Sequence, residues 1–151
     1  MRLNAPKKQE KSYSGKKKCH TIKEQLVIDA QTGKIICVCE AKGAVHDFTL
    51  FKQSKVHIRE EIVLLGDKAY QGIANIHFNS MTPFKTLRKR VLTEEQMQFN
   101  SMLGSIRIKI EHVFRRIKCF KIFGHRYRNK QRKHLLRFSL VCGLFKFDTP
   151  F

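Results

Sequence analysis

The chain has 151 residues, of which 31 are Lys or Arg and 12 are Asp or Glu, giving a formal net charge of +19 and a pI near 10.1. This excess of positive charge predicts a polyanionic partner, most naturally nucleic acid, and the 42% of apolar residues favours a globular chain over a disordered one. The sequence has no run of 18 apolar residues and no Cys or His spacing typical of a disulfide framework or a zinc site, which favours a cytoplasmic protein with no membrane partner.

Residues 1–18 are basic and rich in turn-forming residues, and they end in Lys16, Lys17 and Lys18. The segment offers little apolar surface to bury, so we expect an edge or a loop. Two interpretations stay open for its charges, which form either a solvated face or a surface whose lysines contact phosphates.

Two runs typical of β-strands, Cys19–Ala30 and Lys34–Glu40, flank the turn residues Gln31–Gly33. They predict a β-hairpin, because both runs are rich in β-branched and apolar residues and a glycine-containing turn separates them. Asp29 stands beside this turn, where we expect its side chain to bind the turn backbone rather than a metal ion.

A short helix is predicted over His46–Phe51, with Asp47 as its N-cap and as a reserve candidate for an acid near a metal site. Further along, Ile62–Leu65 is a continuous apolar run that predicts a short buried strand, and Asp67 follows it closely. Functional groups of α/β sheets gather beyond the carboxyl ends of strands. Asp67 is therefore interpreted either as a functional acid or as an ordinary turn residue.

Apolar residues recur at three- and four-residue steps over Ile106–Phe123 and predict an amphipathic helix. On this helix Arg107, Glu111 and Lys118 project within roughly 60° of one another. Glu111 is thus either the partner of Arg107 in an ordinary surface ion pair or a functional acid flanked by two cations.

A capping box at Thr93–Gln96 predicts a helix that continues to Glu111 unless Gly104 breaks it. The tail, residues 121–151, is first basic and aromatic, a composition that suits nucleic acid. It is then apolar over Leu135–Phe147, which predicts a buried final helix too short to span a bilayer. The expected DNA-binding side chains are Lys16, Lys17, Lys18, Lys118, Arg126, Arg128, Lys130 and Arg132.

Several ordered blocks of the sequence resemble one family, the DDE transposases of the insertion-sequence-five type. Arg107-x3-Glu111-x6-Lys118 resembles the third-acid motif of that family, and Gly66-Asp67-x2-Tyr70-Gln71-Gly72 resembles its second-acid motif. Further resembling blocks are Ser12–Lys23 (SYSGKKKCHTIK), Lys42–Phe51 (KGAVHDFTLF) and the basic and apolar tail. The resemblance covers nearly the whole chain.

This resemblance implies an α/β fold, with an RNase H-like mixed sheet and flanking helices. It implies that Asp67 and Glu111 are catalytic acids that bind two Mg²⁺ or Mn²⁺ ions, with Asp47, Arg107 and Lys118 in supporting roles. The implied partner is DNA, as the ends of a mobile element and as its target, and the implied location is the nucleoid.

One acid of the family is missing from the chain. The family's first catalytic acid lies on a strand just before a basic stretch, which is Pro6–Lys11 here, and only Met1–Ala5 precede that stretch. We therefore expect residues 1–151 to be a partial catalytic domain, truncated before its first catalytic strand and inactive unless an upstream-frame product or a full-length transposase completes it. The alternative is a non-catalytic basic nucleic-acid-binding domain in which Glu111 is only an ion-pair partner.

Overall fold

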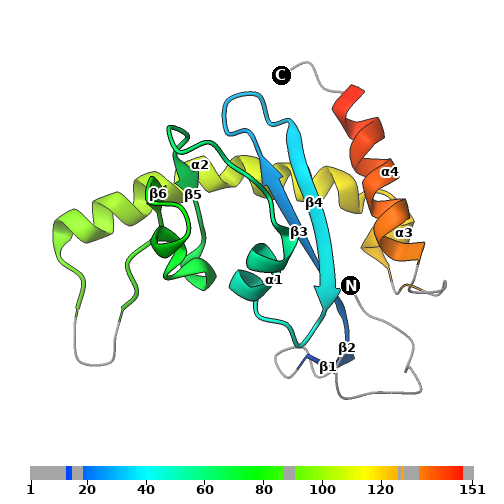
Figure 1. The fold of residues 1–151 in the computed structure, drawn as a ribbon, viewed down its shortest axis with the longest axis horizontal. Coiled ribbons are helices and arrows are strands. Elements are labelled where there is room, and N and C mark those ends of the chain that lie inside the picture. The colour runs from blue at the N-terminus through cyan, green and yellow to red at the C-terminus, as the bar shows by residue number, and fades with distance from the viewer. Residues whose placement is uncertain (1–12, 15–18, 87–90, 126, 128–132, 148–151) are drawn as a thin grey trace. The chain divides into compact units, whose positions relative to one another are not determined.

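Figure 1 shows the computed structural model, which describes residues 13–14, 19–86, 91–125, 127 and 133–147. These residues form helices and small two-stranded sheets, which confirms the predicted α/β class. The chain divides into two compact units, a terminal unit of Met1–Val45 with Lys109–Phe151 and a central unit of His46–Ile108. An RNase H-like sheet and a single partial domain over 1–151 stay predictions.

The predicted hairpin is confirmed in the terminal unit. Strand β3 (Ile22–Ile28) pairs antiparallel with β4 (Ile35–Lys42). Asp29 closes the turn, because its Oδ2 accepts a hydrogen bond from the Thr32 hydroxyl at 2.5 Å and its Oδ1 accepts one from the Gln31 N–H at 2.8 Å. These bonds, the one from Thr32 foremost, hold the pKa of the Asp29 carboxyl below its usual value. Asp29 therefore has the turn role that its position predicts.

The basic N-terminal segment contributes a small antiparallel pair, β1 (Tyr13–Ser14) with β2 (Cys19–His20). Most of the predicted phosphate-binding cations fall outside the described residues. They are Lys16, Lys17, Lys18, Arg126, Arg128, Lys130 and Arg132. Their role in DNA binding stays a prediction.

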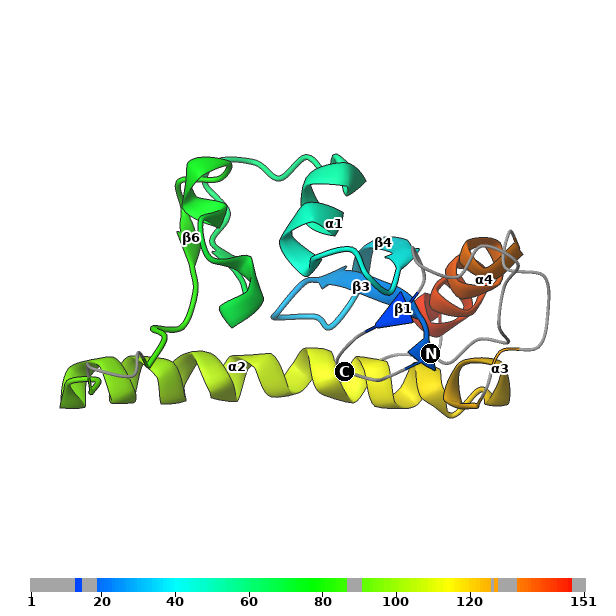
Figure 2. The same ribbon diagram turned by 90° about the horizontal axis from the view of Figure 1, so that it is seen from below.

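Helix α2 (Glu94–Lys118) is one continuous helix of 25 residues, seen along its length in Figure 2. The capping box is confirmed, because the Thr93 N–H donates to Gln96 Oε1 at 3.2 Å and the Gln96 N–H donates to Thr93 Oγ1 at 3.3 Å. Gly104 does not break the helix. The predicted C-terminal end at Phe123 is wrong, since a separate short helix, α3 (Lys121–Gly124), follows the end of α2.

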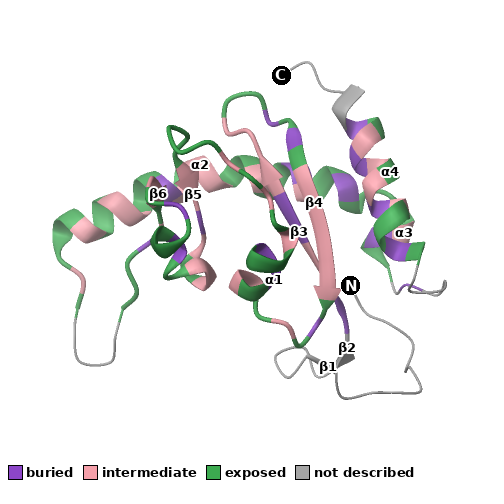
Figure 3. Ribbon diagram, in the orientation of Figure 1, coloured by how far each residue is buried: buried purple, intermediate pink, exposed green. Residues whose placement is uncertain are grey.

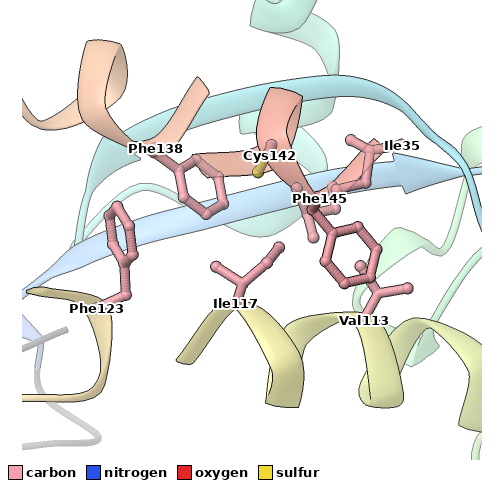
Figure 4. Packing of buried hydrophobic residues seen from close by; sticks show 8 residues of the cluster. Ile35, Val113, Ile117, Phe123, Phe138, Cys142 and Phe145 are labelled. Carbon is pink, nitrogen blue, oxygen red and sulfur yellow. The ribbon is translucent and has the colours of Figure 1, made fainter. Parts of the chain in front are cut away.

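The core of the terminal unit lies where α2, α3 and the hairpin meet α4 (His134–Phe147). Figure 4 shows Val113 and Ile117 of α2 facing Phe145 and Phe138 of α4. The buried cluster consists of Leu26, Ile35, Val113, Ile117, Phe123, Phe138, Cys142 and Phe145. Removal of this apolar surface from water is the main stabilising contribution to the unit.

Helix α4 confirms the predicted final helix, but the predicted burial holds for one face of the helix only. Phe138 is fully buried, whereas Leu136, Leu140 and Leu144 are 60%, 60% and 63% exposed. Figure 3 shows buried and exposed residues alternating along α4. The three leucines are four residues apart and share one face, so only the opposite face packs against the unit. No helix among the described residues is long and apolar enough to cross a membrane.

The central unit contains α1 (Asp47–Ser54), β5 (Leu64–Leu65), β6 (Ser80–Met81) and the first part of α2. Strand β5 pairs parallel with β6 over only two residues. The predicted buried strand over Ile62–Leu65 is therefore too long, since Ile62 and Val63 precede the pairing and are 52% and 46% exposed.

The predicted helix after Gly43 is confirmed as α1, but its predicted cap is wrong. His46 is the N-cap, and its Nδ1 accepts a hydrogen bond from the Phe48 N–H at 3.3 Å. Asp47 instead occupies the first turn, where a carboxylate favours the positive end of the helix dipole. His46 and Asp47 thus both stabilise the N-terminal end of the helix.

Candidate functional site

Asp67 lies directly beyond the carboxyl end of β5, as the sequence predicts. The chain leaves the strand through Gly66, whose N–H donates to the Met81 carbonyl at 2.9 Å. A Cβ at Gly66 would lie 3.0 Å from Cβ of Tyr70 and 3.1 Å from Cγ2 of Thr82, so a larger residue would crowd this exit. The close packing fixes the backbone that carries Asp67.

Most of the motif around Asp67 has a structural role. Tyr70 packs edge-on against Phe51 of α1 with ring centroids 6.2 Å apart, and the Gln71 side-chain amide donates to the Pro83 carbonyl at 2.9 Å. Gly72 has a φ of +87°, a left-handed conformation that glycine adopts at little cost. The motif therefore encodes a rigid turn that presents the carboxylate of Asp67.

Both oxygens of that carboxylate have partners. Oδ1 accepts a hydrogen bond from the Lys68 N–H and so caps a 3₁₀ turn over Lys68–Tyr70. Oδ2 accepts one from Nη2 of Arg107 at 3.1 Å. The side chains of Arg107 and Asp67 are 32% and 45% exposed, so this ion pair is open to solvent. Asp67 and Arg107, which lie 40 residues apart in sequence and belong to different motifs, thus meet in the central unit.

The ion pair of Arg107 differs from the local pair with Glu111 that the spacing allows. Glu111 stands one turn further along α2, in the terminal unit, with its side chain exposed. Within the described part of the chain, Glu111 makes no ion pair. Lys118 is also exposed, and its Nζ lies 5.7 Å from the centre of the Phe114 ring. The catalytic roles of Asp67 and Glu111 stay predictions.

Asp47, the reserve candidate for an acid near a metal site, lies at the start of α1. Asp47 is half-buried in the first turn of α1, which packs against the 3₁₀ turn that Asp67 caps. In the described ranges, no group of three or more His, Cys, Asp or Glu residues is arranged to hold a metal ion. The donors that are present, carboxylate oxygens, are of the type that Mg²⁺ and Mn²⁺ prefer.

A second charged cluster, which sequence reasoning missed, lies in the terminal unit. Glu24 of β3 stands directly opposite Glu40 of β4, and His134 of α4 lies between them with none of its surface exposed. Its Nδ1 contacts Oε2 of Glu40, and its Nε2 lies 3.4 Å from Oε1 of Glu24. The rings of Phe123 and Tyr127 pack edge-on against the imidazole.

The two carboxylates decide the charge of this imidazole. Burial alone would lower the pKa of His134, but the contacts with Glu24 and Glu40 outweigh burial and raise the pKa to about 9. His134 is thus a buried cation at neutral pH that joins α4 to both strands. The opposition of Glu24 and Glu40 follows from the hairpin register, but no sequence spacing points to His134.

The positive charge is distributed unequally between the units. The terminal unit has 22 Lys and Arg against six Asp and Glu, and the central unit has nine against six. Exposed basic side chains among the described residues of the terminal unit are Lys34, Lys42, Lys109, Arg115, Arg116, Lys118, Lys121 and Lys133. A polyanion would therefore be attracted mainly to the terminal unit.

The sequence is similar to known proteins over almost its whole length. A family model described as DDE superfamily endonuclease matches residues 1–146. The chain is 44% identical over 147 residues to a probable transposase for insertion sequence element IS702 from Microchaete diplosiphon, an alignment that covers 97% of this chain and 53% of the relative. The chain thus spans about half the length of the curated relative that it matches. No solved structure matches it.

Proposed function

Because the chain belongs to the DDE superfamily endonucleases, we propose that it is the C-terminal part of a transposase catalytic domain that cleaves DNA and transfers the cut strand. The contact between Asp67 and Arg107 carries this proposal, because it joins two separate motifs of the family at one carboxylate. The charge of the terminal unit supports DNA as the partner, which would place the protein at the nucleoid.

In this proposal Asp67 and Glu111 are two of three catalytic acids. Endonucleases of this superfamily use divalent metal ions, and the carboxylate oxygens suit Mg²⁺ or Mn²⁺. Two such ions, when bound, would activate water or a 3′-hydroxyl and stabilise the leaving oxygen. Before a metal ion binds, Arg107 holds the Asp67 carboxylate. Asp47 supports the turn from α1, and Lys118 contacts a DNA phosphate from the exposed face of α2.

The third acid would come from outside this chain. In the complete protein we propose an RNase H-like sheet whose central strand carries that acid and precedes the segment equivalent to Pro6–Lys11. An upstream-frame product or a full-length transposase would supply the strand. As a consequence, the chain of 151 residues should bind DNA without cutting it.

The test is a joined chain, in which the part of the Microchaete relative that precedes the match is fused to Met1. We expect the joined chain to nick supercoiled plasmid in the presence of Mn²⁺, and Glu111→Gln to abolish nicking without weakening salt-dependent DNA binding, since the change removes an acid from a basic face. Glu95→Gln is the matched control, because Glu95 is an exposed acid in the first turn of the same helix.

Nicking that persists in Glu111→Gln would exclude Glu111 as a catalytic acid. A joined chain that binds DNA with the expected salt dependence but never nicks it would favour a basic DNA-binding domain without catalytic chemistry. Plasmid nicking and salt-dependent filter binding, measured on the same preparations, separate these results.

A further inference from the structure

We propose that Arg107 is the resident counter-ion of Asp67 and that it competes with a divalent metal ion for the same carboxylate oxygen. This inference rests on the proposed function, since it takes Asp67 to be a metal ligand. It adds a coupling step, because a metal ion that displaces Arg107 frees a guanidinium for another anion.

Both oxygens of the Asp67 carboxylate have a partner, and only the partner of Oδ2 carries a charge. Oδ1 is held by the Lys68 N–H at the start of the 3₁₀ turn, and that contact fixes the carboxylate against the backbone. Oδ2 accepts a hydrogen bond from Nη2 of Arg107 at 3.1 Å. A divalent ion on Oδ2 would meet the positive guanidinium at close range, so the two cations repel each other and exclude one another.

Exposure makes this ion pair exchangeable. With the Asp67 side chain 45% exposed and the Arg107 side chain 32% exposed, the pair contributes little to folding. Its loss should therefore leave the central unit folded. The buried cluster at His134 provides the contrast, because a metal ion could not replace that imidazole without opening the core.

A displaced Arg107 would be well placed to bind phosphate. It stands one turn before Glu111 on α2, and its planar guanidinium matches a phosphate group with two parallel hydrogen bonds. Metal binding at Asp67 and phosphate binding at Arg107 would then favour each other. Arg107 would thus neutralise the negative charge of the Asp67 carboxylate until a metal ion and DNA are both present.

The experiment measures Mn²⁺ binding to the 151-residue chain by electron paramagnetic resonance of the free ion. Arg107→Gln should tighten Mn²⁺ binding about fivefold, the range expected for removing one exposed competing charge, and Asp67→Asn should weaken it. Arg107→Lys, which keeps the charge, should remain close to the unsubstituted chain.

Lys109→Gln is the matched control. It removes the same charge two residues further along α2, where Lys109 is exposed and its Nζ donates to the Ala30 carbonyl at 2.7 Å. Any general effect of lowering the net charge appears equally in Lys109→Gln and Arg107→Gln. Only an increase in Mn²⁺ affinity in Arg107→Gln beyond the increase in Lys109→Gln reports competition at Asp67.

The outcomes separate the two proposals. Mn²⁺ binding that is unchanged in Asp67→Asn, or absent from both the unsubstituted chain and Arg107→Gln, removes Asp67 as a ligand of this chain and overturns the inference together with the proposed role of Asp67. Binding that weakens in Asp67→Asn but is no tighter in Arg107→Gln than in Lys109→Gln overturns the inference alone and leaves Asp67 a metal ligand.

Discussion

The two units hold their charged groups in opposite ways. In the terminal unit a histidine that is fully buried joins two glutamates, within a region of strongly positive net charge. In the central unit a half-buried arginine pairs with a half-buried aspartate that solvent still reaches, within a region whose charges nearly balance. Breaking a buried pair leaves a charge without water, whereas an exposed pair can exchange partners at small cost.

We infer from this difference that the charged groups of the two units have different roles. The buried cluster at His134 stabilises the packing of α4 on the hairpin, and the surrounding cations attract a polyanion. The exposed pair at Asp67 keeps a carboxylate available for exchange. We expect changes in the terminal unit to alter stability and DNA affinity, and changes at Asp67 to alter metal binding.

The largest effect is expected from Phe138→Ala. Phe138 is fully buried in the core of the terminal unit, so the truncation should lower the free energy of unfolding by about 3–5 kcal/mol. Residue-resolved hydrogen exchange would show faster exchange in β3 and β4 than in α1. Equal acceleration of α1 would mean that the two units unfold together, and the comparison between them would fail.

The next effect is the pH dependence that His134 imposes. The pKa of its imidazole rises from 6.5 to about 9 in the folded chain, so the stabilisation is complete below pH 6.5 and is lost as the pH rises through 9. Linkage puts the loss at about 3 kcal/mol. Urea unfolding at pH 6 and pH 10, followed by circular dichroism, measures it.

Two histidine variants sharpen that measurement. His134→Gln should be less stable than the unsubstituted chain at pH 6 and should lose most of the decline toward pH 10. His112→Gln, which changes an exposed histidine on α2, should keep the decline in full. A decline of equal size in both variants would assign the pH dependence to other groups.

The outcome for each element shows what a sequence can encode locally. The hairpin, the capping box at Thr93 and the helix over Leu135–Phe147 were predictable because residues close in sequence make their defining contacts. The prediction of a four-residue strand over Ile62–Leu65 was wrong, because an apolar run does not show how many of its residues will pair with a neighbouring strand. Neither Asp47 nor His46 could be chosen as the cap from composition alone, since both side chains can accept a backbone hydrogen bond.

The sequence names candidate residues but not their contacts, and the roles of those residues stay predictions. The motif spacing singled out Asp67, Arg107 and Glu111. It favoured an i,i+4 pair on the helix, whereas Arg107 contacts a carboxylate 40 residues away. His134 is 94 residues from Glu40, so no periodic pattern could join them. Long-range ion pairs depend on the fold as a whole.

A smaller effect is expected on DNA binding. Lys118→Ala should reduce the slope of log affinity against log salt by about one, because the variant loses the phosphate contact that we propose for Lys118. Lys52→Ala is the control, since Lys52 is an exposed lysine of the central unit, with its Nζ 4.5 Å from the centre of the Phe48 ring. Equal slopes for the two variants would show that DNA does not distinguish the units in the way their net charges predict.

The smallest effect concerns the continuity of α2. Gly104 lies inside the helix, and a Cβ added there would meet no atom within 4 Å. Gly104→Ala should therefore stabilise the chain by about 0.5–1 kcal/mol through helix propensity, which raises the midpoint of thermal unfolding by about 1–4 °C. Gly43→Ala is the opposite control, because its Cβ would lie 1.9 Å from Oγ1 of Thr21. A lower midpoint in Gly104→Ala would mean that the helix is interrupted at Gly104 in solution. Arg107 and Glu111, which both follow Gly104, would then lie one turn apart on the second of two shorter helices.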